Sequence, residues 1–210
     1  MRRNALLPVP LLMKRMKVTD ISQEVFSCSV YPGDPAPARE RLRDMEQGDL
    51  YNLSRFSMCA HNGTHIDAPA HFLRDGKTVD ELPLEPFAGY CYVARHQGDV
   101  TAADALKILE KAREKAAWER ILIAGKATVT APAAREFAKA GILLLGNESQ
   151  SVGPEDAPME VHLILLKAQV VLLEGLVLSG VCEGRYLLSA LPLNLGGCEG
   201  APCRACLIEI

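Results

Sequence analysis

The sequence lacks both a long apolar run and an excess of charge of one sign. None of its hydrophobic stretches reaches the roughly 18–20 residues that a helix needs to cross a bilayer. Lysine and arginine number 23 against 26 aspartates and glutamates, which gives a formal net charge of −3. This balance offers no electrostatic reason to bind nucleic acid or an anionic membrane surface. We therefore expect neither nucleic acid nor membrane among the partners.

A disulfide framework is also missing, because the seven cysteines are odd in number and scattered along the chain. A reduced, cytoplasmic protein is the simpler interpretation. Cys203 and Cys206 form a Cys-x-x-Cys pair, but no second Cys or His pair stands at zinc-ribbon spacing. We therefore expect these two cysteines to have no metal or redox function.

Length and composition indicate one globular domain. The 210 residues are 49% hydrophobic and 23% charged, which suits one domain with a sizeable core. The first residues faintly resemble a signal peptide, but two prolines interrupt the apolar part and no small-x-small cleavage site follows. We expect residues 1–15 to be a short disordered extension or part of an over-long gene model, with a targeting segment as the alternative. Residues 16–210 would then form the domain.

Histidine is scarce, yet three of the five histidines fall within residues 61–72. His61, His65 and His71 share this stretch with Asp67, and Pro69 prevents it from being one helix. In a straight strand, His61 and Asp67 would lie roughly 20 Å apart at about 3.3 Å per residue. That separation is too long for ligands that bind one metal at about 2.0–2.2 Å. The chain must curl, and we expect a strand ending near His61 to run into a tight loop.

This density of donors predicts a metal site. Short histidine-rich tracts are a recognised metal-binding pattern, whereas an isolated histidine is more often a structural residue. Histidine and carboxylate donors suit Zn²⁺ or Mn²⁺, and no cysteine lies among them to favour zinc strongly.

The order of the expected elements indicates the fold class. Strands come first, helix–strand units follow, and strands close the chain, which suggests an α/β protein with a mixed sheet. Residues 35–49 are charged and turn-rich, so we expect a mobile surface loop there. The expected helices cover residues 101–118, 130–141 and 158–167.

The histidine-rich stretch also carries a resemblance to a known family. It reads His-x-Gly-Thr-His-x-Asp-x-Pro-x-His-Phe, which resembles the signature of the cyclase family of metal-dependent hydrolases. That family includes bacterial kynurenine formamidase (arylformamidase) and isatin hydrolase. Further likeness at residues 18–23, 31–35, 173–176 and 190–193 extends the resemblance over most of residues 18–210. It implies a three-layer β/β/α fold, sometimes called swivelling, and a homo-oligomer, either a dimer or a tetramer.

The resemblance implies two divalent metals per chain, either zinc or manganese. His61, His65 and Asp67 would hold the first, and Asp67 would bridge to a second held by His162 and Glu174. Glu174 also stands out without the resemblance, because a glutamate ending an apolar strand is costly to bury alone. Binding a cation, or pairing with a histidine, would explain it.

Three further features are candidates for catalysis or substrate binding. His71 lies beside the expected metals and has an ordinary pKa close to neutrality, so it is the candidate acid/base, or else a further ligand. Tyr31 occupies the place of a family tryptophan over the active site and could stack on a flat substrate, or be a plain turn residue. The polar segment 146–151 could contact substrate or be a plain loop.

The predicted activity is hydrolysis of a carbon–nitrogen bond in a small molecule. An aryl formamide cleaved by a metal-activated hydroxide is the first hypothesis. A ring-opening lactam hydrolase of the isatin hydrolase type, a hydrolase or lyase acting on another small molecule, and a metal-binding protein without turnover are the alternatives.

Overall fold

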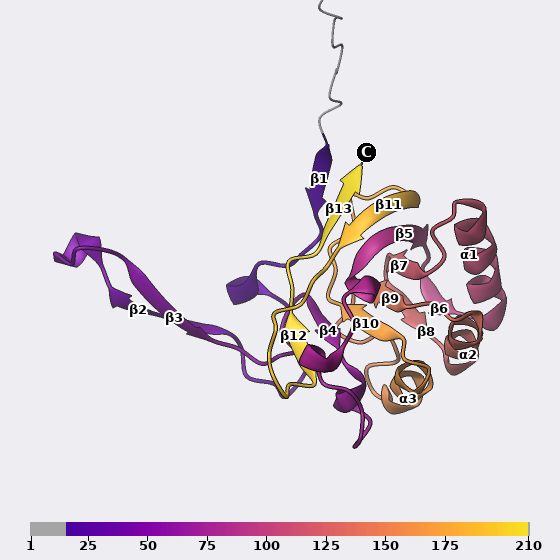
Figure 1. The fold of residues 1–210 in the computed structure, drawn as a ribbon, viewed down its shortest axis with the longest axis horizontal. Coiled ribbons are helices and arrows are strands. Elements are labelled where there is room, and N and C mark those ends of the chain that lie inside the picture. Colours follow the sequence, from indigo (N-terminus) through magenta and orange to yellow (C-terminus); the bar gives the residue numbers. More distant parts are fainter. Residues whose placement is uncertain (1–15, 210) are drawn as a thin grey trace, which may run out of the picture.

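A nine-stranded mixed sheet forms the centre of the molecule (Figure 1). The computed structural model describes residues 16–209, so the expected extension over residues 1–15 lies outside the described residues. The strand order is β1-β13-β11-β5-β7-β9-β10-β4-β12. The strands are β1 (Lys17–Asp20), β4 (His65–Asp67), β5 (Ala88–Arg95), β7 (Arg120–Ala124), β9 (Leu144–Asn147), β10 (Val171–Glu174), β11 (Gly184–Ser189), β12 (Gly200–Pro202) and β13 (Cys206–Glu209).

The middle of the sheet is parallel, and its two ends are antiparallel. Strands β5, β7, β9 and β10 pair in parallel, whereas β4 and β12 at one end, and β11, β13 and β1 at the other, add in antiparallel fashion. Parallel neighbours need crossover connections, and the three helices lie in these crossovers (Figure 1). They are α1 (Ala102–Glu114), α2 (Ala131–Ala140) and α3 (Met159–Lys167).

The helix ends follow from local sequence. Thr101 and Asp104 form a reciprocal capping box at the start of α1. Thr130 caps α2, and Gly141 ends it in a left-handed conformation. The three predicted helices are confirmed, although α1 ends at Glu114, four residues earlier than expected.

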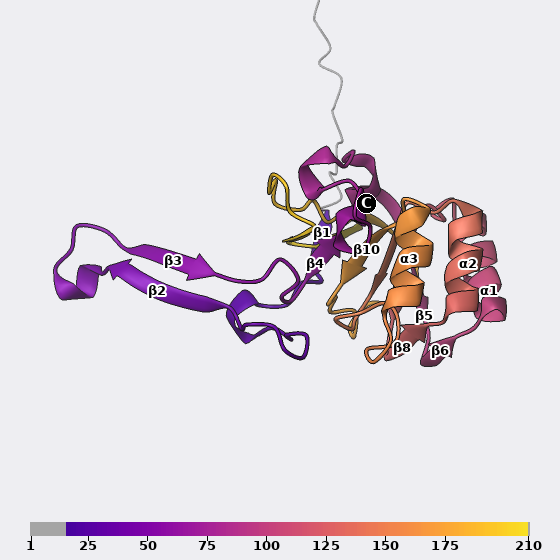
Figure 2. The same cartoon turned by 90° about the horizontal axis from the view of Figure 1, so that it is seen from below.

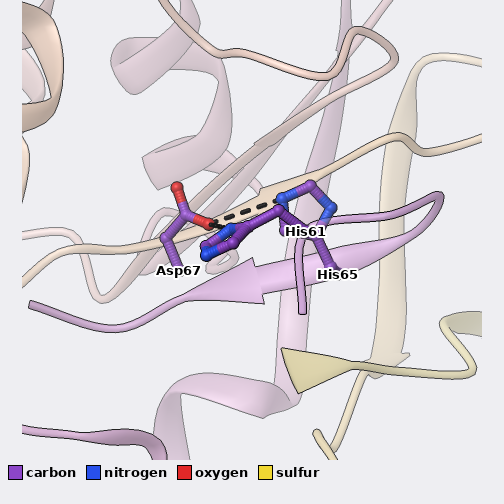
Figure 3. A group of neighbouring side chains, drawn as sticks. All are labelled: His61, His65 and Asp67. Carbon is purple, nitrogen blue, oxygen red and sulfur yellow. Dashed lines mark hydrogen bonds and ion pairs between the residues drawn. The ribbon is translucent and has the colours of Figure 1, made fainter. Parts of the chain in front are cut away.

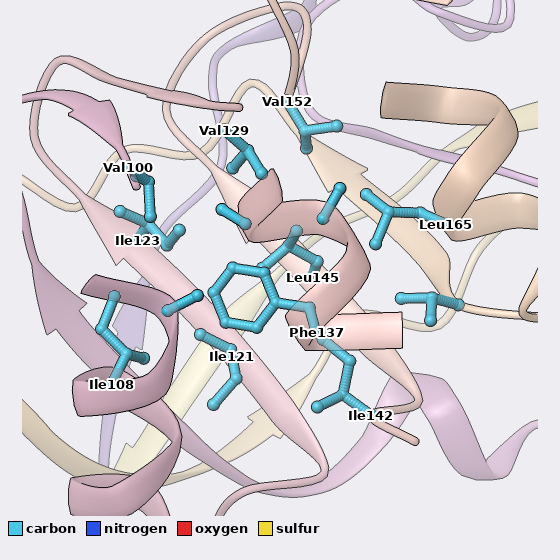
Figure 4. Close-up of a cluster of buried hydrophobic side chains, with 14 of the residues drawn as sticks. Val100, Ile108, Ile121, Ile123, Val129, Phe137, Ile142, Leu145, Val152 and Leu165 are labelled. Atoms are coloured by element: carbon cyan, nitrogen blue, oxygen red, sulfur yellow. The ribbon is translucent and has the colours of Figure 1, made fainter. Parts of the chain in front are cut away.

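Two hydrophobic cores lie on opposite faces of the sheet. One fills the space between the sheet and the helices, around Phe137 and Leu145 (Figure 4). The second includes Ile66 of β4, Val93 of β5 and Leu207 of β13, so both ends of the curled sheet face the same interior. Helices, central strands and curled antiparallel ends therefore form three layers, and the predicted α/β, β/β/α class with a mixed sheet is confirmed.

A long two-stranded ribbon projects from the body (Figure 2). It consists of β2 (Ala38–Arg43) paired antiparallel with β3 (Leu53–Ser57), and all residues of both strands are exposed. The prediction of a loop over residues 35–49 was wrong for Ala38–Arg43, which form a paired strand. Three arginines and one glutamate make up most of β2, and this polar composition concealed its extended conformation.

The remaining elements are short. The expected strand that leads toward His61 ends at Ser57, earlier than predicted. Within residues 16–209, no helix has the length and apolar character needed to cross a bilayer. The short elements are the parallel pair β6 (Gly98–Val100) and β8 (Ala127–Val129), and the 3₁₀ turns η1 (Val25–Ser27), η2 (Met45–Gln47), η3 (Pro69–His71), η4 (Val79–Glu81) and η5 (Glu85–Phe87).

Candidate metal centre

Five side chains from three separate segments of the chain meet at one end of the sheet. His65 and Asp67 lie on β4, and Glu174 ends the neighbouring strand β10. Pairing of β4 with β10 places Glu174 opposite His65. His61 lies in the turn before β4, and His162 lies on α3. Every predicted metal-site residue therefore lies in the cluster, although His65 and Asp67 stand on a strand where we expected a loop.

The first half of the cluster consists of His61, His65 and Asp67 (Figure 3). Asp67 Oδ1 lies 2.8 Å from His61 Nδ1 and 3.4 Å from His65 Nε2. The other ring nitrogen of His65, Nδ1, faces the carbonyl oxygen of Gly63 at 3.0 Å, which directs Nε2 toward the carboxylates. The donor atoms of these three residues lie within 4.8 Å of one another, close enough to share one ion.

The second half of the cluster consists of Asp67, His162 and Glu174. His162 Nε2 lies 3.6 Å from Asp67 Oδ2 and 3.4 Å from Glu174 Oε1. The other ring nitrogen of His162, Nδ1, lies 2.8 Å from the carbonyl oxygen of Pro158, the residue that precedes α3. Asp67 belongs to both halves and directs one carboxylate oxygen toward each.

The cluster is largely buried, and some of its polar atoms lack hydrogen-bond partners. Asp67 is fully buried, and His65, His162 and Glu174 are at most 3% exposed. Two buried atoms, His65 Nε2 and Asp67 Oδ2, have no hydrogen-bond partner among residues 16–209. Unpartnered buried polar groups are costly. Since both atoms face the cluster and are good donors to a divalent cation, these residues fit a bound metal.

The electrostatics of the metal-free cluster support the same interpretation. Burial alone would lower the pKa values of His65 and His162, but pairing with Asp67 and Glu174 outweighs it and raises both to about 10. Burial alone would raise the pKa of Asp67, yet its three histidine neighbours hold it well below the usual range. These pKa values favour protonated imidazoles at both positions in the absence of metal. A divalent cation could replace the two protons, which would be released when it binds.

His71 lies beside the cluster and outside both donor groups. It ends η3, and its ring stacks on that of His61 with centroids 4.0 Å apart. Burial lowers the pKa of His71 below its ordinary value. Its ring is therefore neutral near pH 7 and able to accept a proton.

A cavity of about 300 Å³ opens onto the cluster. Tyr31 lines it, and the Tyr31 hydroxyl donates to the carbonyl oxygen of Glu155 at 2.6 Å. Sequence analysis considered substrate contact by the polar segment 146–151, and Gln150 and Ser151 of this segment line the cavity. Glu148 instead accepts from the backbone amides of Gly125 and Leu178.

Sequence reasoning gave no individual role to five residues that line this cavity. They are Asp34, Phe72, Gln150, Ser151 and Pro158. Side-chain oxygens of Gln150 and Ser151 are buried without a hydrogen-bond partner among the described residues. Phe72 could have been found from the sequence, because it closes the histidine-rich motif. Within the polar segment 146–151, the sequence did not distinguish the residues that line the cavity from those that do not.

A curled mixed sheet with a buried cluster of three histidines and two carboxylates defines a candidate metal-dependent enzyme, and comparison with known proteins agrees. A family model described as "Putative cyclase" matches residues 18–153. Kynurenine formamidase of Erythrobacter litoralis (strain HTCC2594) is 34% identical over 205 residues, covering 92% of this chain and 94% of that relative. Kynurenine formamidase of Bacillus anthracis is 35% identical over 214 residues, covering 94% of this chain and 100% of that relative.

Solved structures share the fold. A structure described as a potential metal-dependent hydrolase with cyclase activity superposes with a TM-score of 0.78 at 28% identity, covering 93% of this chain and 99% of that one. Isatin hydrolase A from Labrenzia aggregata, solved with benzyl benzoate, superposes with a TM-score of 0.77 at 20% identity, covering 92% and 93% of the two chains. The chain belongs to the cyclase family. The predicted resemblance and the predicted class, a metal-dependent hydrolase, are confirmed.

Proposed function

We propose that this protein is a metal-dependent amidohydrolase that cleaves the carbon–nitrogen bond of a small aryl formamide. The observation that carries the proposal is the pair of donor groups that share Asp67. One group contains His61 and His65, and the other contains His162 and Glu174. The relatives named kynurenine formamidase support the choice of a formamide.

The metal content follows from the same donors. Two divalent cations per chain, zinc or manganese, would use Asp67 as a bridge, since each of its oxygens faces a different half of the cluster. When bound, such cations supply Lewis-acid chemistry, polarising an amide carbonyl and making a water molecule easier to deprotonate.

The side chains of this protein would then transfer the proton and bind the substrate. A neutral ring nitrogen of His71 accepts a proton from the attacking water as the carbon–oxygen bond forms. His71 returns that proton to the leaving nitrogen as the carbon–nitrogen bond breaks. Its stacking on His61 supports this role, because it holds the ring beside the donors. Tyr31 would bind the aromatic part of the substrate in the cavity that it lines.

A lactam-opening reaction is the second candidate. The same atoms would break the same type of bond, but the leaving nitrogen would remain attached to the product. A cavity of about 300 Å³ lies at the lower end of the range typical of small-molecule sites. It is compatible with either a compact formamide or a bicyclic lactam.

The test combines metal analysis with a hydrolysis screen. Wild-type protein purified without chelator or nickel affinity should hold about two zinc or manganese ions per chain, and Glu174→Gln should lose one. Wild type should hydrolyse aryl formamides faster than lactams, and Glu174→Gln should be impaired. Bound metal without hydrolysis of either class would favour the metal-binding protein instead. Absence of metal would contradict the proposal.

A homo-oligomer, dimer or tetramer, completes the proposed function. The support is the ribbon formed by β2 and β3, which projects from the body with every strand residue exposed. A two-stranded ribbon is marginally stable in water when nothing packs against it. Apolar side chains near its tip, including Leu50 at 94% and Tyr51 at 56% exposure, favour a second copy of the chain as the covering surface.

A further inference from the structure

Glu199 lies on the opposite side of His61 from Asp67. The two ring nitrogens of His61 have different neighbours: Nδ1 lies 2.8 Å from Asp67 Oδ1, and Nε2 lies 3.3 Å from Glu199 Oε1. Glu199 belongs to neither donor group and does not line the cavity. Its carboxylate therefore contacts the cluster through His61.

The backbone fixes Glu199 in this position. The Ala68 amide donates to the Glu199 carbonyl oxygen at 2.9 Å, just beyond β4. The next residue, Gly200, pairs with Asp67 across β12 and β4. Glu199 thus precedes the strand that borders the ligand-bearing strand, and its location does not depend on a flexible loop.

Gly200 allows the His61 ring to lie against this strand. A Cβ atom at Gly200 would stand 2.6 Å from His61 Cε1 and 2.9 Å from Nε2. Real side chains cannot approach this closely, so a glycine is required for the ring to pack here. On another side the ring of His71 stacks on that of His61. The orientation of the His61 ring is therefore defined by its neighbours on several sides.

The chemistry of imidazole then assigns a role to the carboxylate. A neutral imidazole has one nitrogen with a lone pair and one with a hydrogen, and a metal takes the lone pair. If Nδ1, which faces Asp67, is the donor to metal, then Nε2 carries the hydrogen and needs an acceptor. Metal-ligating histidines commonly donate their second N–H to a carboxylate, which fixes the tautomer and raises ligand basicity.

We propose that Glu199 is a positioning residue of the metal centre, whose carboxylate accepts the His61 Nε2–H hydrogen bond and thereby presents Nδ1 to the metal. The inference rests on the proposed metal-dependent function. It adds an outer carboxylate, just before β12, to the five residues that would hold the ions. The side chain of Glu199 is 46% exposed, so water competes for this bond.

The decisive experiment is a zinc titration of metal-free protein in competition with a chromophoric chelator. Glu199→Ala should weaken binding of the zinc held by His61, His65 and Asp67 about 10-fold, the lower end of the effect typical of such outer carboxylates. Glu199→Gln should fall between Glu199→Ala and wild type, because its carbonyl oxygen still accepts. Glu199→Asp should retain more affinity than Glu199→Ala. Glu114→Ala, which removes an exposed carboxylate on α1, is the matched control and should bind like wild type.

A second measurement reports the tautomer directly. Nitrogen-15 NMR of the His61 ring in zinc-loaded wild type should show a protonated Nε2 and a metal-bound Nδ1. In Glu199→Ala, the Nε2–H signal should exchange faster with water. A metal-bound Nε2 in wild type would overturn the inference.

The outcomes separate the inference from the proposed function. Wild-type zinc binding with unchanged affinity in Glu199→Ala would overturn the inference alone. Loss of a complete zinc equivalent in Glu199→Gln would identify Glu199 as a direct ligand and would also overturn it. Wild type that binds neither zinc nor manganese would overturn both. If Glu199→Ala fails to fold, the Gln and Asp variants carry the comparison.

Discussion

Asp67 is the residue on which the candidate centre depends. It faces three histidines, is fully buried, and offers one oxygen to each donor group. A buried carboxylate at this position is stable only when cations or protonated histidines surround it. Its place between two strands, β10 and β12, keeps it in the interior.

His71 provides the sharpest test of catalysis at the level of one residue. Replacing it with asparagine removes the group that accepts and returns a proton, so kcat should fall about 10²–10⁴-fold. Metal content should stay at the wild-type level, because His71 is outside both donor groups. Steady-state kinetics and elemental analysis check the two parts.

His96→Asn is the matched control for this prediction. His96 follows β5, is half-buried, and its ring Nε2 lies 3.0 Å from the carbonyl oxygen of Asp99. It should keep wild-type kinetics. Loss of metal in His71→Asn would instead support the alternative that His71 is a ligand.

At the scale of elements, the turn after β7 depends on a glycine. Gly125 has φ +115°, and a Cβ there would stand 2.2 Å from the carbonyl oxygen of His96. Gly98 has φ +75°, but nothing lies within 4 Å of its would-be Cβ. At both positions the positive φ would strain a residue other than glycine. Only at Gly125 would the added Cβ also collide with neighbouring atoms.

Substituting alanine at both positions separates these effects. Gly98→Ala should lower the free energy of unfolding by about 1–2 kcal/mol, the cost of a left-handed conformation for an L-residue. Gly125→Ala should cost clearly more, since the backbone of His96 must move. Urea unfolding measures both, and equal costs would show that the turn adjusts freely.

The β2–β3 ribbon is the element that we propose contacts a second copy of the chain. We expect Leu50→Asp combined with Tyr51→Asp to shift the protein toward monomer, because charged groups would be placed in the proposed contact. Light scattering after size-exclusion chromatography measures the mass. Leu106→Asp on α1, an exposed apolar position away from the ribbon, is the control and should leave the mass unchanged. A monomeric wild type would contradict the proposed oligomer.

For the whole molecule, the histidine cluster predicts how stability depends on pH in the absence of metal. The pKa values of His65 and His162 are raised in the folded state to about 10, from an ordinary 6.5. Their contribution to stability is fully present below about pH 6.5 and is lost as pH rises toward 10. Asp67 acts in the opposite sense, because its pKa is lowered, so its contribution is lost in acid.

Chemical denaturation of metal-free protein between pH 5 and 10 checks this prediction. Wild type should lose stability above about pH 6.5, and His162→Gln should lose less over the same range. Zinc should reverse the loss at high pH, since the cation replaces the departing protons. A metal-free stability that is independent of pH across this range would contradict the pairing described.

The sequence by itself determined the helices and the family, and it predicted the candidate ligands. His61, His65, His71 and Asp67 are close in sequence, so their common location required only that the chain curl. Caps at Thr101 and Thr130 and a glycine at Gly141 marked helix boundaries locally. Assigning His162 and Glu174 to the second metal depended on the family resemblance, because each is isolated in sequence.

Only the tertiary structure decided the features that depend on contacts between distant segments. Pairing of β4 with β10 and β12 turned an expected loop into a strand and brought Glu174 and Glu199 to the histidines. The polar ribbon strand β2 showed no hydrophobic alternation, since neither of its faces packs on the core. Local sequence patterns indicate which side chains are buried and where the chain turns. The register of strand pairing determines which distant side chains come into contact.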